Sequence, residues 1–365
     1  MKLPDLPTPC LVLDRGILLH NIGAMARVLA RRNVPLRPHM KTAKSIEVAR
    51  LATAGQPGGI TVSTLAEAEY FAGHGIADIL YAVGITPQKL DHVSRLNQAG
   101  ASISIVTDDI DVAGAIAAHE RPPRTLIEID SGESRGGVAP DDPLLPEIAA
   151  RLGANLAGVM THAGHSYSGR SPADMVRIAE GERAGVVRAA ERLRAAGHTV
   201  TIVSMGSSPT ALHAESLAGV TEVRAGVYMF GDLFQAEIGT HDLGSIAVTV
   251  LTSVIGRRPG RMLVDAGGLA MSKDRSTEAA PKDYGFGLVL DLAGRQRFGD
   301  LVVRRAYQEH GVIEPDPALG LDLPIGAKLR IAPNHTCMTA AAHDRYHVVE
   351  GEDEVLAIWP RVNGW

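Results

Sequence analysis

The sequence has few of the features that mark secreted, membrane-embedded or disulfide-rich proteins. Its 365 residues include only two cysteines, Cys10 and Cys337, and their wide separation makes a disulfide a poor explanation of either. No apolar run reaches membrane-spanning length without a glycine or a charge, and the N-terminus lacks the apolar segment of a signal peptide. We therefore expect a soluble, cytoplasmic protein with no membrane partner.

Positive charge is also scarce. The 36 lysines and arginines are outnumbered by 41 aspartates and glutamates, which gives a formal net charge of -5 and a pI near 6.3. No block or stripe of basic residues provides a field that would hold a phosphate backbone. We predict that nucleic acid is not a partner.

The sequence does contain a regular alternation of short β-branched runs with longer helical patterns, from roughly residue 10 to residue 235. Repeated strand–helix units require a parallel sheet with both faces covered, and their number suits a closed (β/α)8 barrel of the TIM type. A doubly wound open sheet is the competing architecture. The strand candidates are 10–14, 34–42, 59–64, 78–84, 102–108, 124–132, 156–164, 199–206 and 221–230.

The pattern changes after about residue 240. Strand-like runs then follow one another, separated by Gly, Pro and Asp turns, with no convincing helices between them. This pattern predicts an antiparallel β domain. We expect the barrel to cover residues 10–235 and the β domain to cover residues 240–365 together with 1–9.

A lysine ends one of the predicted barrel strands. Lys41 lies at the carboxyl end of the segment VPLRPHMKT, just before Thr42, and barrel enzymes keep their chemistry at the carboxyl ends of their strands. Partial desolvation at that end would lower the pKa of the lysine and make its amine nucleophilic, as Schiff-base formation requires. An exposed loop lysine is the alternative interpretation. We assign the nearby Lys44 to the surface or to a helix start.

A turn rich in small polar residues follows a later strand. The segment VSMGSSPTA, residues 203–211, opens into a helical pattern, and backbone N–H groups with hydroxyls at such a turn suit a phosphate. The same residue types also merely cap helices. The next strand supplies Gly226 and Tyr228 at its end, so two consecutive loops could share one phosphate. Together with Lys41, this arrangement points to pyridoxal phosphate held across the barrel mouth.

A candidate metal pair lies in the segment PNHTCMTAAAH, residues 333–343. In a strand, His335 and Cys337 would face the same side, so that an imidazole and a thiolate could bind one ion. These ligands favour zinc, with Mn²⁺ or another divalent ion as alternatives. Two protein ligands leave coordination positions open, which suits a catalytic metal. Simple packing is the alternative reading of the pair.

The segments RPHMKT, VSMGSSPT, QEHGVIE, PNHTCMTAAAH and WPRVNGW, taken in this order, resemble the metal-dependent D-serine dehydratase and D-threonine aldolase family. The resemblance covers nearly the whole chain. It implies an alanine racemase-like, fold-type III pyridoxal phosphate enzyme that acts as a homodimer on β-hydroxy D-amino acids. It also implies that Lys41 forms a Schiff base with the cofactor, that Arg135 lies near the pyridine nitrogen, and that Tyr167 is an active-site tyrosine.

The resemblance assigns the remaining cofactor and metal contacts as well. His335 and Cys337 match the zinc pair of the family. The residues that match its phosphate-binding positions are Gly206, Ser207, Ser208, Thr210, Gly226 and Tyr228.

The same resemblance favours dehydration over carbon–carbon cleavage. The aldolase branch tends to carry His-x-Asp and a Gly-Gly-Gly-Thr-Gly turn, whereas this chain has His335-Thr336-Cys337 and a Gly-Ser-Ser turn. We therefore expect a D-serine dehydratase that forms pyruvate and ammonia and also accepts D-threonine. The alternatives are a D-threonine aldolase or 3-hydroxy-D-aspartate lyase, an amino acid racemase, and a non-catalytic pyridoxal phosphate carrier. The added β domain argues against a carrier. His162 and His165 stay open between ligand contact and hydrogen bonding within the loops, and His39 stays open between orienting the site and simple packing.

Overall fold

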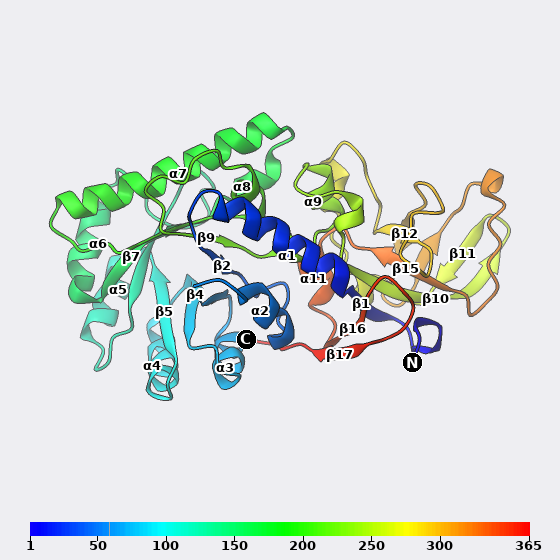
Figure 1. Cartoon of the computed structure of the whole chain (residues 1–365), viewed down its shortest axis with the longest axis horizontal. Helices are drawn as coiled ribbons and strands as arrows, with labels where there is room; N and C mark the ends of the chain where they lie inside the picture. The colour runs from blue at the N-terminus through cyan, green and yellow to red at the C-terminus, as the bar shows by residue number, and fades with distance from the viewer. Residues whose placement is uncertain (58) are drawn as a thin grey trace. The chain divides into compact units, whose positions relative to one another are not determined.

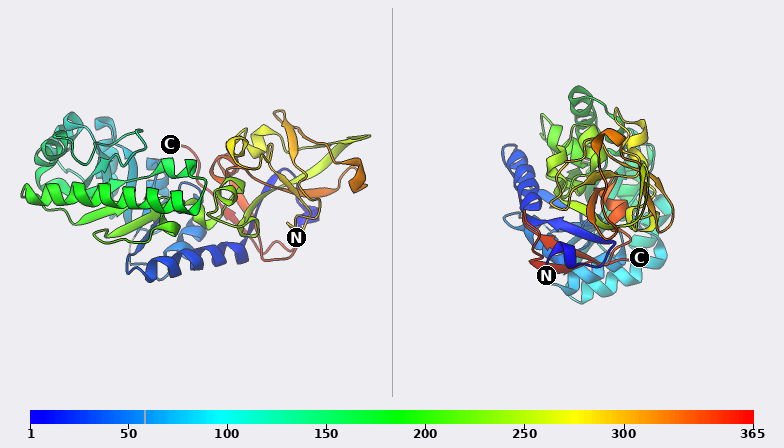
Figure 2. Two further views of the ribbon diagram at one scale, coloured as in Figure 1. Left: turned by 90° about the horizontal axis from the view of Figure 1, so that it is seen from above. Right: turned by 90° about the vertical axis from the view of Figure 1, so that its right-hand side faces the viewer.

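The computed structural model describes residues 1–57 and 59–365, and the chain forms two compact units. One unit comprises Met1–Gly23 and Val227–Arg361, and the other comprises Ala24–Gly226 and Val362–Trp365. Figures 1 and 2 show the elements of both units. Within the described residues, no helix is long and apolar enough to cross a membrane.

The second of these units is built on an eight-stranded parallel sheet in the order β2-β9-β8-β7-β6-β5-β4-β3. His39, directly after β2, forms a parallel bridge with Thr61 in β3, so the two ends of the sheet meet. The predicted barrel is confirmed, and the open doubly wound sheet is excluded. The barrel strands are β2 (Leu36–Pro38), β3 (Ile60–Val62), β4 (Asp78–Gly84), β5 (Ser102–Thr107), β6 (Thr125–Ile129), β7 (Leu156–Thr161), β8 (Ile202–Met205) and β9 (Glu222–Ala225).

Helices connect the barrel strands, as the alternating pattern predicts. The longest helix, α7 (Pro172–Ala195), packs against β7 and β8 (Figure 1). Its buried side chains form a mostly apolar stripe along its length. α1 (Arg15–Ala30) contains the boundary between the two units. The other barrel helices are α2 (Ile46–Thr53), α3 (Leu65–Gly73), α4 (Leu90–Gln98), α5 (Ile110–Ala118), α6 (Leu144–Leu152), α7 (Pro172–Ala195) and α8 (Ser208–His213).

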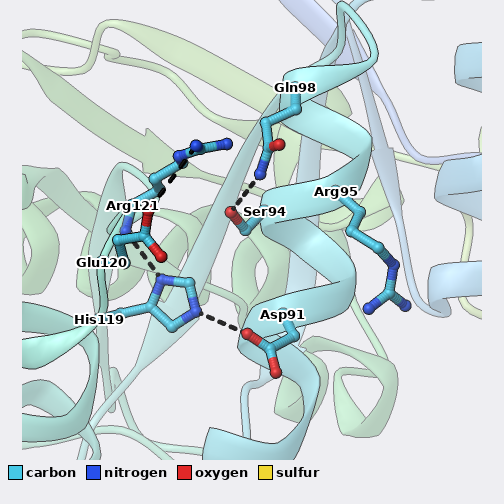
Figure 3. Close-up of a pocket in the computed structure, with 7 residues that line it drawn as sticks. All are labelled: Asp91, Ser94, Arg95, Gln98, His119, Glu120 and Arg121. Carbon is cyan, nitrogen blue, oxygen red and sulfur yellow. Dashed lines mark hydrogen bonds and ion pairs between the residues drawn. The ribbon is translucent and has the colours of Figure 1, made fainter.

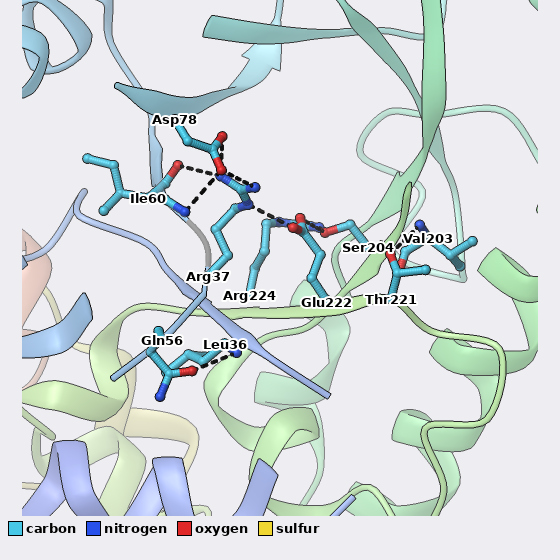
Figure 4. Close-up of polar contacts among 11 residues, drawn as sticks. Leu36, Arg37, Gln56, Ile60, Asp78, Val203, Ser204, Thr221, Glu222 and Arg224 are labelled. Atoms are coloured by element: carbon cyan, nitrogen blue, oxygen red, sulfur yellow. Dashed lines mark hydrogen bonds and ion pairs between the residues drawn. The ribbon is translucent and has the colours of Figure 1, made fainter. Parts of the chain in front are cut away.

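A network of charged side chains lies in the barrel, between β2, β4, β8 and β9 (Figure 4). Arg37 on β2 donates hydrogen bonds to Asp78 at the start of β4 (3.0 Å) and to Glu222 on β9 (2.8 Å). Arg224, also on β9, donates to the Ser204 hydroxyl on β8 (2.5 Å). Both guanidinium groups are buried, and buried charges of this kind are tolerated only when they are paired.

The other unit contains a larger, mixed sheet. Its strands follow the order β13-β14-β11-β10-β1-β16-β17, and β15 pairs with both β10 and β12. All pairs are antiparallel except β1 with β16, so the predicted antiparallel β domain is confirmed, with one parallel pair in its sheet. The strands are β1 (Cys10–Asp14), β10 (Val248–Arg258), β11 (Arg261–Val264), β12 (Leu288–Leu290), β13 (Val303–Ala306), β14 (Gly311–Ile313), β15 (Lys328–Ala332), β16 (Arg345–Val349) and β17 (Ala357–Pro360).

Three short helices also interrupt this unit, and two of them lie after residue 240, where the sequence predicted none. They are α9 (Leu233–Glu237), α10 (Gly268–Met271) and α11 (Thr336–Ala340).

The domain limits expected from the sequence need correction at both ends. β1, which was expected to be the first barrel strand, pairs instead with β10 and β16 of the mixed sheet. All five of its residues are buried, and an apolar run buried on both faces looks the same in a barrel and in the middle of a mixed sheet. The barrel unit also ends at Gly226 and not at residue 235.

Candidate active site

Lys41 lies three residues beyond the carboxyl end of β2, where the sequence placed it. β2 is short and ends at Pro38, and the chain then turns through residues 39–43. The Lys41 side chain is exposed, and its backbone N–H donates to Nδ1 of His39 (3.3 Å). The amine of Lys41 is therefore accessible at the barrel end where parallel-barrel enzymes bind their ligands.

Two histidines lie close enough to Lys41 to be affected by its charge. Burial lowers the pKa of His39 well below its usual value, and the charges of Lys41 and Arg224 lower it further. Burial and the charge of Lys41 likewise lower the pKa of His162 to about 3, against an opposing hydrogen bond from its Nδ1 to the Gly206 carbonyl (2.9 Å). Both imidazoles are thus neutral at neutral pH. For His162, the structure shows hydrogen bonding within the loops.

Gly206 marks the start of the predicted phosphate turn, and its backbone conformation requires glycine. Its φ angle is +132°, and a Cβ atom there would lie 2.3 Å from the carbonyl oxygen of Arg224. Ser207 and Thr210 then form a capping box at the start of α8, with Ser207 N–H donating to the Thr210 hydroxyl (3.0 Å) and Thr210 N–H donating to the Ser207 hydroxyl (3.2 Å). Ser208 is buried beside them. These hydroxyls cap a helix, and their contact with a phosphate stays a prediction.

Gly226 and Tyr228 follow β9. A Cβ atom at Gly226 would lie 3.0 Å from the His39 carbonyl oxygen, so a side chain there would be crowded. Tyr228 belongs to a 3-10 helix (Val227–Met229) that starts the other compact unit. Burial raises the pKa of its phenol, and its backbone carbonyl accepts a hydrogen bond from Nε2 of His241 (2.9 Å). Its predicted contact with the cofactor stays a prediction.

Arg135 and Tyr167 also follow carboxyl ends of barrel strands. Arg135 comes after β6, is 58% exposed, and forms ion pairs with Glu133 (3.3 Å) and Glu128 (3.9 Å). Tyr167 lies in the 3-10 helix Gly164–Ser168 after β7 and is partly buried. Since the carboxyl ends of the strands in a closed parallel barrel meet at one end, the predicted barrel residues are brought to the same end of the barrel.

Two buried residues near these loops were not predicted. Arg224 lies in β9, a strand that the sequence predicted to be buried. Glu222 and Arg224 occupy alternate positions of this strand, so both side chains point to the same face. Glu182 lies on the buried face of α7 among Met175, Ile178, Ala179 and Val186, and its carboxylate accepts hydrogen bonds from two loop N–H groups. A charge at a buried position of an otherwise regular pattern is the sequence signal that identifies such residues.

The candidate metal pair has a different local structure from the one predicted. β15 ends at Ala332, Pro333 follows, and His335 is the N-cap residue of the short helix α11 rather than part of a strand. Cys337 lies in the first turn of this helix. Cys337 is nevertheless close enough to raise the pKa of His335. Their joint binding of one ion stays a prediction, and the strand geometry expected for them is wrong.

Asp274 holds the imidazole of His335. Its Oδ2 lies 3.1 Å from Nδ1 of His335, which leaves Nε2 for another ligand. Burial lowers the pKa of His335, but the hydrogen bonds to Asp274 and Cys337 and the charges of Cys337 and Asp232 outweigh it and raise that pKa to about 11. Such a carboxylate–histidine pair is typical of metal sites.

The donor set fits a metal bound by two protein ligands. Across residues 1–57 and 59–365, no group of three or more His, Cys, Asp or Glu side chains is arranged to hold a metal. An imidazole and a partly exposed thiol, with coordination positions left open, suit a catalytic rather than a structural ion. Cys10 has no such role: burial raises the pKa of its thiol to about 11, as expected for a small buried hydrophobe.

The assignment of Lys44 to the surface is wrong. Its Nζ lies 3.0 Å from Oε1 of the buried Glu67, and its side chain is only 14% exposed. Lys44 directly precedes Ser45, the N-cap of α2, so its placement near a helix start is confirmed.

A polar pocket of about 330 Å³ lies on the barrel unit between α4 and the segment after α5 (Figure 3). Its charged side chains mostly bind one another: His119 pairs with Asp91 (3.1 Å), and Arg121 with Glu120 (3.7 Å). None of the predicted site residues lines it. It is therefore not part of the candidate active site.

Comparisons with known proteins agree with the two units. Residues 13–233 match the family model of the alanine racemase N-terminal domain, and residues 247–349 match the model of a putative serine dehydratase domain. These matches define the class: an alanine racemase-like barrel followed by a serine dehydratase domain.

Individual relatives span almost the whole chain. D-threo-3-hydroxyaspartate dehydratase of Delftia sp. (strain HT23) is 44% identical over 99% of this chain and 98% of its own, and its solved structure superposes over 100% of both chains with a TM-score of 0.96 at 43% identity. D-serine dehydratase of Dictyostelium discoideum is 30% identical, covering 96% of this chain and 95% of its own. A 3-hydroxy-D-aspartate aldolase of Paracoccus denitrificans is 30% identical, covering 98% of this chain and 92% of its own. The chain belongs to the D-serine dehydratase and D-threonine aldolase family and is a lyase.

Proposed function

We propose that this lyase is a pyridoxal phosphate- and metal-dependent dehydratase of β-hydroxy D-amino acids. The observation that carries the proposal is that one chain holds an accessible lysine at the end of a barrel strand and a His–Cys pair whose histidine is oriented by a carboxylate. A barrel lysine suits pyridoxal phosphate, and the His–Cys pair suits a divalent ion with open positions.

Lys41 would hold the cofactor through its amine. Pyridoxal phosphate, when bound, withdraws electrons from the α-carbon of the substrate and makes its proton acidic. Lys41 Nζ would then accept that α-proton as the general base. The neutral His39 and His162 beside it would add no positive charge next to this amine.

The other predicted barrel residues would bind and orient. The phosphate would lie against the turn that starts at Gly206, with Gly226 and Tyr228 as further contacts, and Arg135 and Tyr167 would contact the ring. Gly206 and Gly226 support this role, because a Cβ atom at either would meet a backbone carbonyl at 3.0 Å or less.

His335 and Cys337 would hold zinc, with Mn²⁺ or another divalent ion as the alternatives. The bound ion would supply Lewis acidity that turns the β-hydroxyl of the substrate into a better leaving group. Asp274 would fix the ring of His335 for this purpose. The proposal is supported by a relative: a cysteine-to-alanine mutant of D-threo-3-hydroxyaspartate dehydratase is described as being in the metal-free form.

D-threo-3-hydroxyaspartate is the first substrate to test, because the dehydratase named for it is 44% identical to this chain over nearly its full length. D-serine, expected from the sequence, stays a prediction. The 30% identity to a 3-hydroxy-D-aspartate aldolase makes carbon–carbon cleavage the second candidate function. The homodimer and the cytoplasmic location also stay predictions.

The test is a product analysis of purified protein loaded with pyridoxal phosphate and zinc. With D-threo-3-hydroxyaspartate, a dehydratase releases oxaloacetate and ammonia, whereas an aldolase releases glycine and glyoxylate. D-serine, D-threonine, D-alanine and the L-enantiomers of the hydroxy amino acids are assayed in parallel, and Cys337→Ser protein serves as the metal-site control. Release of glycine would refute dehydration, inversion of D-alanine would support a racemase instead, and full activity of metal-free Cys337→Ser protein would refute the metal site.

A further inference from the structure

A single side-chain atom of Glu182 joins two neighbouring strand-end loops. It lies on α7, and its side chain is completely buried. Its Oε1 accepts a hydrogen bond from the N–H of Ala163, after β7, at 2.8 Å and another from the N–H of Gly206, after β8, at 3.0 Å. One oxygen therefore fixes the spacing between the ends of two adjacent barrel strands.

The two loops are joined again further along. The hydroxyls of Ser166 and Ser207 lie 3.0 Å apart in a buried contact, and His162 binds the Gly206 carbonyl. Tyr167 follows the first of these serines, and the capping box of α8 starts at the second. The loops that Glu182 joins are thus the ones that carry the ring and phosphate residues of the proposed cofactor site.

The buried carboxylate is an expensive way to join two loops, because an ionised group loses its hydration. Burial raises the pKa of Glu182, against the opposing effects of its hydrogen bonds and of Arg224. Its second oxygen, Oε2, has no partner of hydrogen-bonding geometry among the described residues, although the Thr210 hydroxyl is near enough to lower the carboxyl pKa. If this contact only held the fold together, an apolar side chain at this position would suffice. The two loops would then be hydrogen-bonded directly to each other, and no charge would lose its hydration.

The N–H of Gly206 is also committed to Glu182, so it is not available to a phosphate. Gly206 allows the turn because of its positive φ and its lack of a side chain, and the Glu182 carboxylate fixes its position. We propose that Glu182 is a positioning residue that holds the turn starting at Gly206 in the geometry that receives the phosphate of pyridoxal phosphate. This inference rests on the proposed function.

The test compares the affinities of pyridoxal phosphate and of pyridoxal, which lacks the phosphate, for four proteins. These are the wild type, Glu182→Ala, Glu182→Gln and Glu180→Gln. Glutamine keeps an oxygen that can accept both N–H groups, whereas alanine removes it. Glu180 lies on the same helix but is half exposed and pairs only with Arg183, so its variant is the matched control.

We expect Glu182→Ala to weaken binding of pyridoxal phosphate by about tenfold or more, as the loss of two hydrogen bonds to a buried acceptor implies, and to leave pyridoxal binding unchanged. Glu182→Gln and Glu180→Gln should bind both ligands as the wild type does, within about threefold. If Glu182→Ala does not fold, Glu182→Asp replaces it, because its carboxylate is one methylene too short to reach both N–H groups.

Three results would overturn the inference. Equal weakening of both ligands would mean that Glu182 supports only the fold, and an equal loss in Glu182→Gln would mean that its charge rather than its acceptor atom matters. Unchanged binding in Glu182→Ala would remove its role altogether while leaving the proposed function intact. Failure of the wild type to bind pyridoxal phosphate would instead refute the proposed function itself.

Discussion

His335 and Asp274 are joined by a hydrogen bond of 3.1 Å between Nδ1 of the imidazole and Oδ2 of the carboxylate. Asp274 lies 61 residues before its partner, in the segment between α10 and the 3-10 helix Ser276–Ala279. The bond engages Nδ1, so a metal would be bound through Nε2. A carboxylate in this position also makes the imidazole a better donor to a metal.

Replacing Asp274 with Asn should therefore weaken zinc binding by roughly 10–100-fold, the usual effect of losing such a partner. The measurement is a competition titration of the metal against a chelator of known affinity. Asp322→Asn is the control, because Asp322 is 76% exposed and pairs with Arg257 away from this histidine. Unchanged zinc affinity in the Asp274 variant would show that the carboxylate does not orient a metal ligand.

The architecture could be predicted because the strands of the barrel are short, buried on both faces and separated by helices. The same property caused the wrong prediction for β1. A fully buried strand has no alternation of polar and apolar residues, so its sequence does not show which sheet it joins. The pair His335 and Cys337 was found from residue type, but its geometry was not, because nothing in the sequence after Pro333 distinguishes a strand from one helical turn. Glu182 and Asp274 were missed, since their partners are distant in the chain.

Two nearby lysines should respond to substitution in opposite ways. Lys41→Ala should abolish turnover and the absorbance of the lysine-bound cofactor, while changing the free energy of unfolding by less than about 0.5 kcal/mol, because its side chain is exposed. Lys44→Ala should destabilise the protein by about 3 kcal/mol, because it leaves the buried Glu67 without its cation.

Urea unfolding and a turnover assay on both lysine variants provide the measurements. The refolded or remaining folded fraction of Lys44→Ala should retain cofactor absorbance, which separates the two roles. Appreciable lyase activity in Lys41→Ala would contradict the assignment of this residue, and an unaltered unfolding free energy in Lys44→Ala would contradict the importance of the buried pair.

The two cysteines should differ in reactivity toward iodoacetamide. Cys337 is partly exposed and lies beside His335, in surroundings typical of reactive thiols, whereas Cys10 is buried and its thiol pKa is raised to about 11. Native protein treated with a chelator should take up one label, at Cys337, and added zinc should suppress that labelling. Mass spectrometry of the digested protein identifies the site; labelling of Cys10 before unfolding, or no protection by zinc, would be inconsistent with this account.

Stability should fall in mild acid partly because of His162. The pKa of this histidine is about 3 in the folded chain and about 6.5 when unfolded, so between these values the unfolded state binds the extra proton. Its contribution is fully present above pH 6.5 and is lost as the pH falls, by at most about 1.4 kcal/mol per pH unit. The depressed pKa of His39 acts in the same direction.

His162→Gln should reduce this acid sensitivity, because glutamine keeps an N–H donor for the Gly206 carbonyl but does not titrate. The measurement is the urea unfolding free energy at several pH values between 7 and 5, for the wild type, for His162→Gln, and for His20→Gln as an exposed-histidine control. The slope of stability against pH should be shallower only in His162→Gln. Three parallel slopes would mean that His162 is protonated equally in the folded and unfolded states, and that its burial against the loop does not hold it neutral.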